Sequence, residues 1–401
     1  MVGAVGTVAI LKAIFGSCPT FYSDSSGTPI LEAEGFSNSI APLFEQRDVD
    51  RLRTGVASDG TVRLEVRNEA LETHYINHLE LLEARHRIGE TVVPDQRGFP
   101  LVLGAMSPAQ FARDRAGRDV SRVLASADGD IFATDSGTLA AADSADLEDY
   151  VDITVQRPAV GDSMAIVFRL RNSLLNTVLL YDGILADPGA ASLDWLGNDL
   201  QKITNAIDLG RWYGKHMGMR VSVRDGGDFR QVARFSDKGP IAFHDVAVII
   251  PAPPGDSVRV RLSFVADDWR IDRVSFATKF SRAPVRTIPL SAVVGSDDTA
   301  DSAAFASLST TDDRYLKTTP GQRFSARFAT GGIAADSVRT FMLASQGYYT
   351  EWVRGSWINK KSTAAKPFEA TDASLARAIK RWRSRQADLE QQFYSTAIPT
   401  R

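Results

Sequence analysis

Short segments in which apolar and polar residues alternate are the feature that most constrains the fold of this chain. One face of residues 61–67 is apolar, and so is one face of residues 258–265. The apolar positions are Val62, Leu64 and Val66 in the first segment and Val258, Val260, Leu262 and Phe264 in the second. A period of two is typical of a strand with one buried face. Several such segments follow one another between residues 219 and 345, which predicts sheets packed as in a β-sandwich.

The predicted fold class is α+β, mainly β. It combines β-sandwich-like domains with a helical insertion and a C-terminal helix, after a short N-terminal hydrophobic anchor. A chain of 401 residues is long enough for two or three domains. The predicted parts are an anchor or leader at 1–18, a β-rich domain at 19–125, an acidic linker or insertion at 126–149, a β-sandwich-like domain at 150–350 with a helical block at 173–217, and a basic tail with an amphipathic helix at 351–401.

Three local patterns give more detailed expectations. Asp225-Gly226-Gly227-Asp228 is a hairpin signal between two apolar runs. Residues 269–280 are expected to pair with the preceding strand at 258–265. Residues 104–126 are expected to form a loop and a short helix, because Pro94, Gly98 and Pro100 end the strand pattern before them.

The N-terminal leader suggests attachment to a membrane. Residues 2–16 are apolar or small except for Lys12, and Cys18, the single cysteine, follows them. The run is shorter than the roughly 20 residues of a spanning helix. Three interpretations remain: a lipoprotein signal with Cys18 acylated after cleavage, an uncleaved anchor with Lys12 at the interface, or a buried N-terminal strand or helix. The first two are favoured, and they predict a membrane-tethered protein on the periplasmic side of the inner membrane or in the cell envelope.

The C-terminal tail differs in charge from the rest of the chain. Residues 351–401 carry a formal charge of +5, and residues 1–350 carry −8. Such a tail suggests either docking on an anionic surface or a solvated helix face. From Asp372 onward the pattern predicts a helix with one apolar face and one basic face. Packing of Trp382 on the body is favoured, and Trp382, Arg381 and Arg385 are also candidates for partner contact.

Residues 348–357 hold the densest group of aromatic side chains. This segment is the strongest candidate for contact with a partner, because Tyr, Trp and Arg are frequent at binding hot spots. The alternative is that these side chains cover the edge of the core. The candidate residues are Tyr348, Tyr349, Trp352, Arg354 and Trp357.

Two groups of motifs resemble a family of bacterial envelope-anchored, β-rich proteins with a Ser-Cys-Pro start. The first comprises Ser17 to Ser23, Glu32-Ala33-Glu34, Leu64 to Ile76, and Val93-Pro94-Asp95; the second comprises Asp312 to Tyr315, Thr319 to Gln322, and Arg339 to Tyr348. The family has no assigned role and brings no catalytic residues. The resemblance implies an exported, surface-attached protein. An accessory subunit that braces a membrane complex, such as a respiratory or photosynthetic assembly, is the narrower expectation.

Motifs for chemistry are weak throughout the sequence. His74 and His78 are four residues apart, but the surrounding pattern is that of a strand and the glutamate of a metalloprotease helix is missing. Asp128-Gly129-Asp130 and residues 225–228 are too short for a twelve-residue calcium loop. Three aspartates flank Trp269, as in a sugar subsite or at a strand end where charge stays in water. Neither a nucleophile elbow nor a phosphate loop matches.

These observations predict no catalytic residues, no metal and no cofactor. The net charge of −3 gives no reason to expect nucleic acid as a partner. The predicted function is a non-catalytic, membrane-tethered scaffold or accessory subunit that contacts other subunits of a membrane complex. The alternative is an extracellular module that binds carbohydrate or another ligand, and a hydrolase is the third hypothesis.

Overall fold

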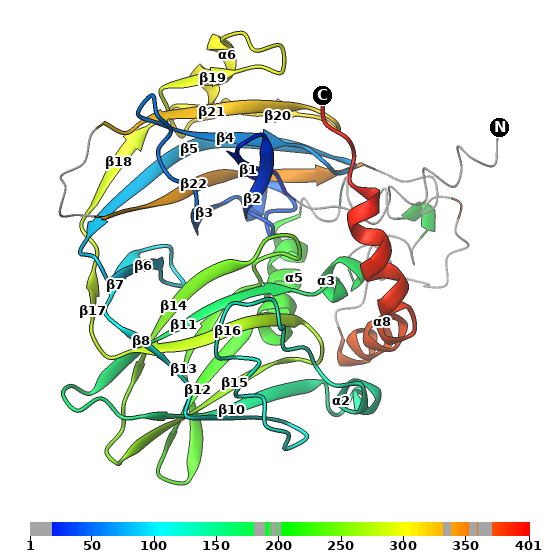
Figure 1. The fold of residues 1–401 in the computed structure, drawn as a ribbon. Helices are drawn as coiled ribbons and strands as arrows, with labels where there is room; N and C mark the ends of the chain where they lie inside the picture. The colour runs from blue at the N-terminus through cyan, green and yellow to red at the C-terminus, as the bar shows by residue number, and fades with distance from the viewer. Residues whose placement is uncertain are drawn as a thin grey trace.

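The computed structural model describes residues 18–179, 189–191, 194, 198, 202–331, 338–352, 359 and 371–401. Their strands form five sheets, which are named A to E in the order of their stacking (Figure 1). The prediction of a mainly β chain with several sheets and a C-terminal helix is confirmed. The predicted anchor lies outside the described residues, apart from Cys18.

Sheets A and B form the upper sandwich. Sheet A has the order β19-β21-β4-β1-β2, with bounds Ala292–Val294, Arg323–Ala329, Thr61–Arg67, Thr20–Ser25 and Thr28–Glu34. Sheet B has the order β18-β5-β22-β3, with bounds Val285–Pro289, Glu72–His86, Val338–Glu351 and Gln46–Arg51, and β20 (Leu316–Thr318) also pairs with β5. Alternate residues of both sheets, including Leu64, Leu81 and Phe328, fill one apolar core between them.

Sheets D and E form the lower sandwich. Sheet D has the order β14-β11-β16-β8, with bounds His244–Pro251, Ser163–Asn172, Trp269–Ala277 and Met106–Pro108. Sheet E has the order β13-β12-β15-β10-β9, with bounds Asp228–Phe235, Met219–Asp225, Ser257–Val265, Glu148–Gln156 and Phe111–Asp114. Their shared core includes Ile166, Val260 and Trp269. The hairpin predicted at residues 225–228 is confirmed as the turn between β12 and β13.

Sheet C joins the two sandwiches. It has the order β17-β7-β6, with bounds Phe280–Arg282, Pro100–Leu103 and Thr91–Pro94. Val92 packs with the apolar residues of sheet B, whereas its neighbour Val93 packs with those of sheet D. Successive side chains of a strand point to opposite faces, so this short sheet is buried on both. The result is a stack of five layers, A to E.

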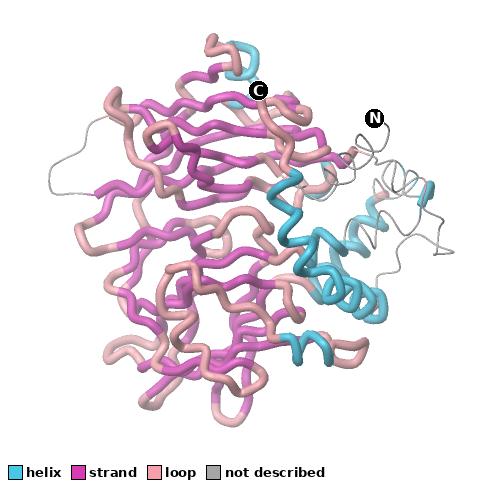
Figure 2. Tube along the Cα trace, turned by 45° about the vertical axis from the view of Figure 1, so that its right-hand side comes forward, coloured by secondary structure: helices cyan, strands magenta, loops and turns pink. Residues whose placement is uncertain are grey.

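The helices gather mainly along one side of this stack (Figure 2). Their bounds are Pro42–Phe44 (η1), Ser136–Ala141 (α2), Leu175–Val178 (α3), Gly189–Ala191 (η3), Ile203–His216 (α5), Ser302–Leu308 (α6), Asp372–Phe393 (α8) and Tyr394–Thr396 (η5). Trp382 and Phe393 of α8 share an apolar cluster with Leu175 of α3 and Trp212 of α5. Among the described residues, no helix has the length and apolar composition needed to cross a bilayer.

The chain leaves the upper sandwich and later returns to it. Strands β5 and β22 form a long antiparallel pair, although they lie more than 250 residues apart in the chain. The predicted range 150–350 therefore contributes β10 to β16 to the lower sandwich and β18 to β22 to the upper one. Within the predicted linker at 126–149, α2 forms and Phe132 bridges to Ile271.

Two local predictions were wrong. Strand β16 pairs with β11 and not with β15. The turn at Asp267, which has a φ of 65°, carries the chain from sheet E to sheet D, so the apolar faces of the two strands meet across the core. Residues 104–126 contain the short strands β8 and β9 and no helix.

Polar contacts that are buried or half-buried fix one sandwich to the other. The Glu34 carboxylate, at the end of β2, accepts hydrogen bonds from the backbone N–H groups of Ile241 and Ala242 (2.5 and 2.7 Å). Glycine is required at position 239, because φ is 103° and a Cβ there would lie 1.4 Å from Glu34 Oε1. Burial raises the pKa of the Glu34 carboxyl to about 7, although the charge of His244 and the two N–H groups oppose the rise.

Three ion pairs extend this connection. Lys238 Nζ lies 3.1 Å from Asp48, His244 Nδ1 lies 2.6 Å from Asp50, and Arg51 lies 3.0 Å from Asp245. Burial alone would lower the pKa values of Lys238 and His244, but the facing carboxylates raise both. Removing one member of such a pair leaves a buried charge without its counterpart. The two sandwiches are therefore joined by directional contacts as well as by sheet C.

Candidate functional site

Three tyrosines form a cluster on sheet B. Tyr75 of β5 and Tyr348 of β22 are register partners, and their rings stack with centroids 4.6 Å apart and an interplanar angle of 6°. Tyr315, just before β20, meets both rings edge-on, at 6.3 and 5.4 Å. All three side chains are half-buried, so each keeps part of its surface in solvent. We call Tyr75, Tyr315 and Tyr348 the tyrosine patch.

Polar groups surround the tyrosine patch. Glu45 accepts hydrogen bonds from Tyr315 Oη (2.7 Å), Asn77 Nδ2 (3.0 Å) and Gln346 Nε2 (3.0 Å). Desolvation and the Glu45 carboxylate raise the pKa of Tyr315 to about 12, so its hydroxyl remains a donor at neutral pH. Lys317 Nζ lies 5.3 Å from the centroid of the Tyr75 ring. Fixed aromatic surface with a polar border is a common feature of binding hot spots.

The five aromatic and basic candidates of residues 348–357 lie in different environments. Tyr348 belongs to the tyrosine patch. Trp352 is 43% exposed, and its Nε1 donates to Thr73 Oγ1 at 2.9 Å. Tyr349 is buried, and its hydroxyl donates to the carbonyl of Ser37 at 3.0 Å. Arg354 and Trp357 lie outside the described residues.

The candidate residues on α8 also differ in their exposure to solvent. The side chain of Trp382 is fully buried, and its Nε1 donates to Asp267. This confirms the prediction that Trp382 packs on the body of the protein. Arg385 is exposed and Arg381 is half-buried. A partner or a membrane would meet the basic face of α8 and not Trp382.

Cys18 lies directly before β1. It is buried, and its φ of 75° is unusual for a residue other than glycine. Thr20 Oγ1 donates to Glu69 Oε2 at 2.7 Å, and the backbone N–H of Ile398 donates to the Glu69 carbonyl at 2.8 Å. The start of β1 and the C-terminal segment therefore lie side by side. Lys12 lies outside the described residues.

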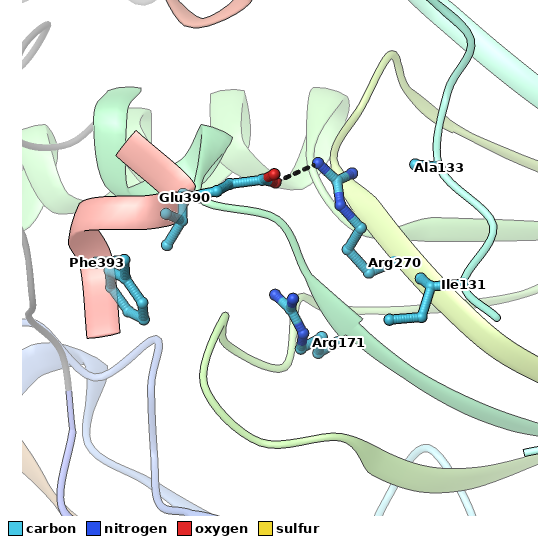
Figure 3. Close-up of a pocket in the computed structure, with 7 residues that line it drawn as sticks. Ile131, Ala133, Arg171, Arg270, Glu390 and Phe393 are labelled. Atoms are coloured by element: carbon cyan, nitrogen blue, oxygen red, sulfur yellow. Dashed lines mark hydrogen bonds and ion pairs between the residues drawn. The ribbon is translucent and has the colours of Figure 1, made fainter. Parts of the chain in front are cut away.

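A cavity of about 350 Å³ lies beside the C-terminal end of α8 (Figure 3). This volume falls within the range of about 300–1,000 Å³ that is usual for small-molecule sites. Leu174, Arg270 and Phe393 are buried, whereas Ile131 and Glu390 reach solvent. The lining residues are Ile131, Ala133, Arg171, Leu174, Arg270, Glu390 and Phe393.

Arg270 is the central polar group of this cavity. Its Nη1 donates to Asp267 Oδ1 at 2.7 Å, and its Nη2 donates to Glu390 Oε1 at 2.8 Å. Burial would lower the pKa of the guanidinium, but Asp267 and Glu390 raise it. Arg171 Nη1 donates to the carbonyls of Asn172 and Pro240, both at 3.0 Å. Two fixed guanidinium groups and the Glu390 carboxylate thus border a cavity whose remaining lining is apolar.

The expectation that the aspartates around Trp269 stay in water was wrong. Asp267 and Asp268 are fully buried, and Asp272 is 6% exposed. Asp267 binds Arg270, and Asp272 lies 3.2 Å from Arg169. Burial and the neighbouring Asp237 raise the pKa of Asp268 well above its usual range. These groups therefore hold turns in place within the protein.

The histidines on β5 each have a partner within the chain. His74 Nε2 lies 2.7 Å from Glu72 Oε1, and burial lowers the pKa of His74 to about 3. His78 Nδ1 lies 3.0 Å from the Leu308 carbonyl, and His86 Nε2 lies 2.9 Å from Thr340 Oγ1. In the described part of the chain, no three His, Cys, Asp or Glu side chains are grouped so as to hold a metal ion.

Comparisons with known proteins identify no relative. No family model and no curated protein matches the sequence. Among solved structures, a GH31 alpha-xylosidase from Xanthomonas citri matches with 10% identity, a TM-score of 0.21, and coverage of 80% of this chain and 29% of that chain. The secreted serine protease VesC from Vibrio cholerae matches with 9% identity, a TM-score of 0.17, and coverage of 58% and 51%. The chain thus spans about half or less of those two proteins, and TM-scores this low support no conclusion about fold or function.

Proposed function

We propose that this protein is a non-catalytic scaffold or accessory subunit, held at the extracytoplasmic side of a membrane by its N-terminal segment. It contacts other subunits of a membrane complex, such as a respiratory or photosynthetic assembly. The observation that carries the proposal is the tyrosine patch, because it presents ordered aromatic surface on a rigid sheet. Trp352, the residue directly after β22, adds a second exposed aromatic side chain four residues beyond Tyr348.

The arrangement of the tyrosine patch suits contact with a protein. Stacked and edge-on rings lose little further conformational freedom when a partner binds, so less of the contact energy is spent on ordering them. Glu45, Asn77 and Gln346 supply polar groups next to the rings. Truncating Tyr348 and Trp352 together should weaken such a contact without disturbing the sandwich cores.

Cys18 marks where an N-terminal attachment would meet the folded body. The cysteine is separated from β1 by Pro19 alone, and β1 is hydrogen-bonded to β2 on one side and β4 on the other. A lipid or anchor at this point would be linked directly to sheet A without a flexible spacer. The scaffold would then be held close to the membrane in a restricted orientation.

Membrane fractionation of the full chain and of a chain that starts at Pro19 tests the attachment. The full chain is expected in the membrane pellet and the shortened chain in the soluble fraction. A Cys18→Ser variant separates the two modes of attachment, because it abolishes acylation and leaves an apolar anchor intact. Unchanged membrane association of the shortened chain would rule out the N-terminal tether.

Binding of a carbohydrate is the second candidate function, and the same patch favours it. An aromatic ring beside carboxylate and amide groups can stack on a sugar ring and bind its hydroxyls. A glycan array with the wild type and Tyr348→Ala distinguishes the candidates. A specific glycan signal that the substitution abolishes would support the carbohydrate module, whereas retention of membrane partners by glycan-free protein would support the scaffold.

A further inference from the structure

The cavity beside α8 combines one basic wall with apolar walls. Arg171 and Arg270 supply two guanidinium groups, and Glu390 supplies one carboxylate, so the lining has a formal charge of +1. Phe393, Leu174 and Ile131 supply the apolar surface. We propose that this cavity binds a small amphipathic carboxylate, with its carboxylate on the arginines and its hydrocarbon part against Phe393 and Leu174.

The Glu390 carboxylate marks where the ligand's carboxylate would bind. It accepts from Arg270 Nη2 at 2.8 Å, and Figure 3 shows this contact at the edge of the cavity. The Glu390 side chain is 42% exposed, whereas that of Arg270 is 6% exposed. Glu390 can therefore turn outward into water, where its charge is solvated. A ligand carboxylate that replaces it would restore the charge-assisted hydrogen bond to Arg270.

Asp267 keeps Arg270 ready for this exchange. Its two carboxylate oxygens lie 2.7 and 3.2 Å from Nη1 and Nη2 of the guanidinium, and Trp382 Nε1 also donates to Asp267. The guanidinium therefore stays in place when Glu390 leaves. A site whose donor is already oriented loses less affinity to the ordering of side chains.

The apolar part of the cavity selects against very small anions. Leu174 and Phe393 are 3% and 1% exposed, so the wall that they form belongs to the apolar interior. Each methylene that moves from water to an apolar wall favours binding. A carboxylate with a hydrocarbon chain should therefore bind more tightly than acetate, and more tightly than a neutral molecule of the same length.

Isothermal titration calorimetry of the full chain with octanoate, 1-octanol and acetate tests the proposal, below micelle-forming concentrations. Octanoate is expected to bind at least about tenfold more tightly than 1-octanol, the factor that corresponds to about 1.4 kcal/mol. Glu390→Gln is expected to raise octanoate affinity about tenfold, because it removes the competing charge. Equal binding of octanoate and 1-octanol, or no binding of octanoate, would overturn the proposal.

A matched pair of variants at the rim checks the location. Ile131 is 37% exposed, so its replacement leaves the buried core intact. Ile131→Glu is expected to weaken octanoate binding about tenfold by like-charge repulsion, whereas Ile131→Gln, of the same size, should weaken it much less. Equal effects of the two substitutions would contradict a charge-selective site here. Far-UV circular dichroism and thermal melting of the ligand-free variants show that each is folded.

Discussion

Replacing Glu34 with alanine is expected to cause one of the largest losses of stability in this protein. The substitution removes the acceptor of two buried backbone N–H groups, those of Ile241 and Ala242. Each unsatisfied buried donor costs about 1–3 kcal/mol, so we expect a loss of about 3 kcal/mol or more in the free energy of unfolding. Urea denaturation at pH 6, followed by circular dichroism, measures it.

Glu34→Gln is the matched control. The glutamine carbonyl can accept the same two N–H bonds, and its amide can donate to Ser37, which now donates to Glu34 Oε1 at 3.2 Å. We expect this variant to lie within about 1 kcal/mol of the wild type at pH 6, the size of one ordinary hydrogen bond. An equal loss for both variants would show that the two N–H bonds are not what Glu34 contributes.

The same residue predicts how stability depends on pH. The pKa of Glu34 is about 7 in the folded chain, above the value of 4.5 for an unperturbed glutamate. The folded state therefore holds this proton more tightly, and the associated stability is complete below pH 4.5 and lost as the pH rises through 7. The loss is roughly 3 kcal/mol, at 1.36 kcal/mol for each pKa unit. Because part of the loss occurs below pH 5, the wild type should lose about 2.5 kcal/mol more stability between pH 5 and 8.5 than Glu34→Gln does.

Trp382→Ala is expected to release α8 from the body. Trp382 is fully buried in the cluster that joins α8 to α3 and α5. Truncation of a buried tryptophan costs about 3–5 kcal/mol. We expect a lower melting temperature and rapid trypsin cleavage within α8, where basic residues such as Arg377 and Arg383 are already exposed. Mass spectrometry of the digest locates the cut.

Trp382→Phe separates packing from hydrogen bonding at this position. It keeps an aromatic ring in the cluster but loses the Nε1 donor to Asp267. Asp267 retains Arg270 as a partner, so we expect a cost of about 1–3 kcal/mol and slow cleavage. Trypsin resistance of Trp382→Ala equal to that of the wild type would contradict the role of this residue in holding α8.

The sequence predicted those parts of the fold that depend on local patterns. Alternation at Val62, Leu64 and Val66 identified β4, and the Asp225–Asp228 turn identified a hairpin. The apolar face of residues 372–393 predicted α8 and its packing through Trp382. Each of these signals lies within one element, where the period of buried side chains is set by backbone geometry.

Pairing between distant segments was not predictable in this way. No local signal brings β5 and β22 together, and the tyrosine patch depends on that pairing, because Tyr75 and Tyr315 are remote from Tyr348 in the sequence. The position of Asp272 was misassigned for the same reason, since its partner Arg169 lies about a hundred residues away. Charge at a turn is normally solvated, and only the tertiary partner reverses that expectation.

Site-specific photo-crosslinking in intact membranes tests the scaffold proposal most directly. A benzophenone amino acid at position 348 places the probe in the tyrosine patch. The same probe at position 160 is the control, because Val160 is 86% exposed and lies on the lower sandwich. We expect a specific crosslink from position 348 to an integral membrane protein, and none from position 160. No crosslink from position 348, or the same products from both positions, would contradict it.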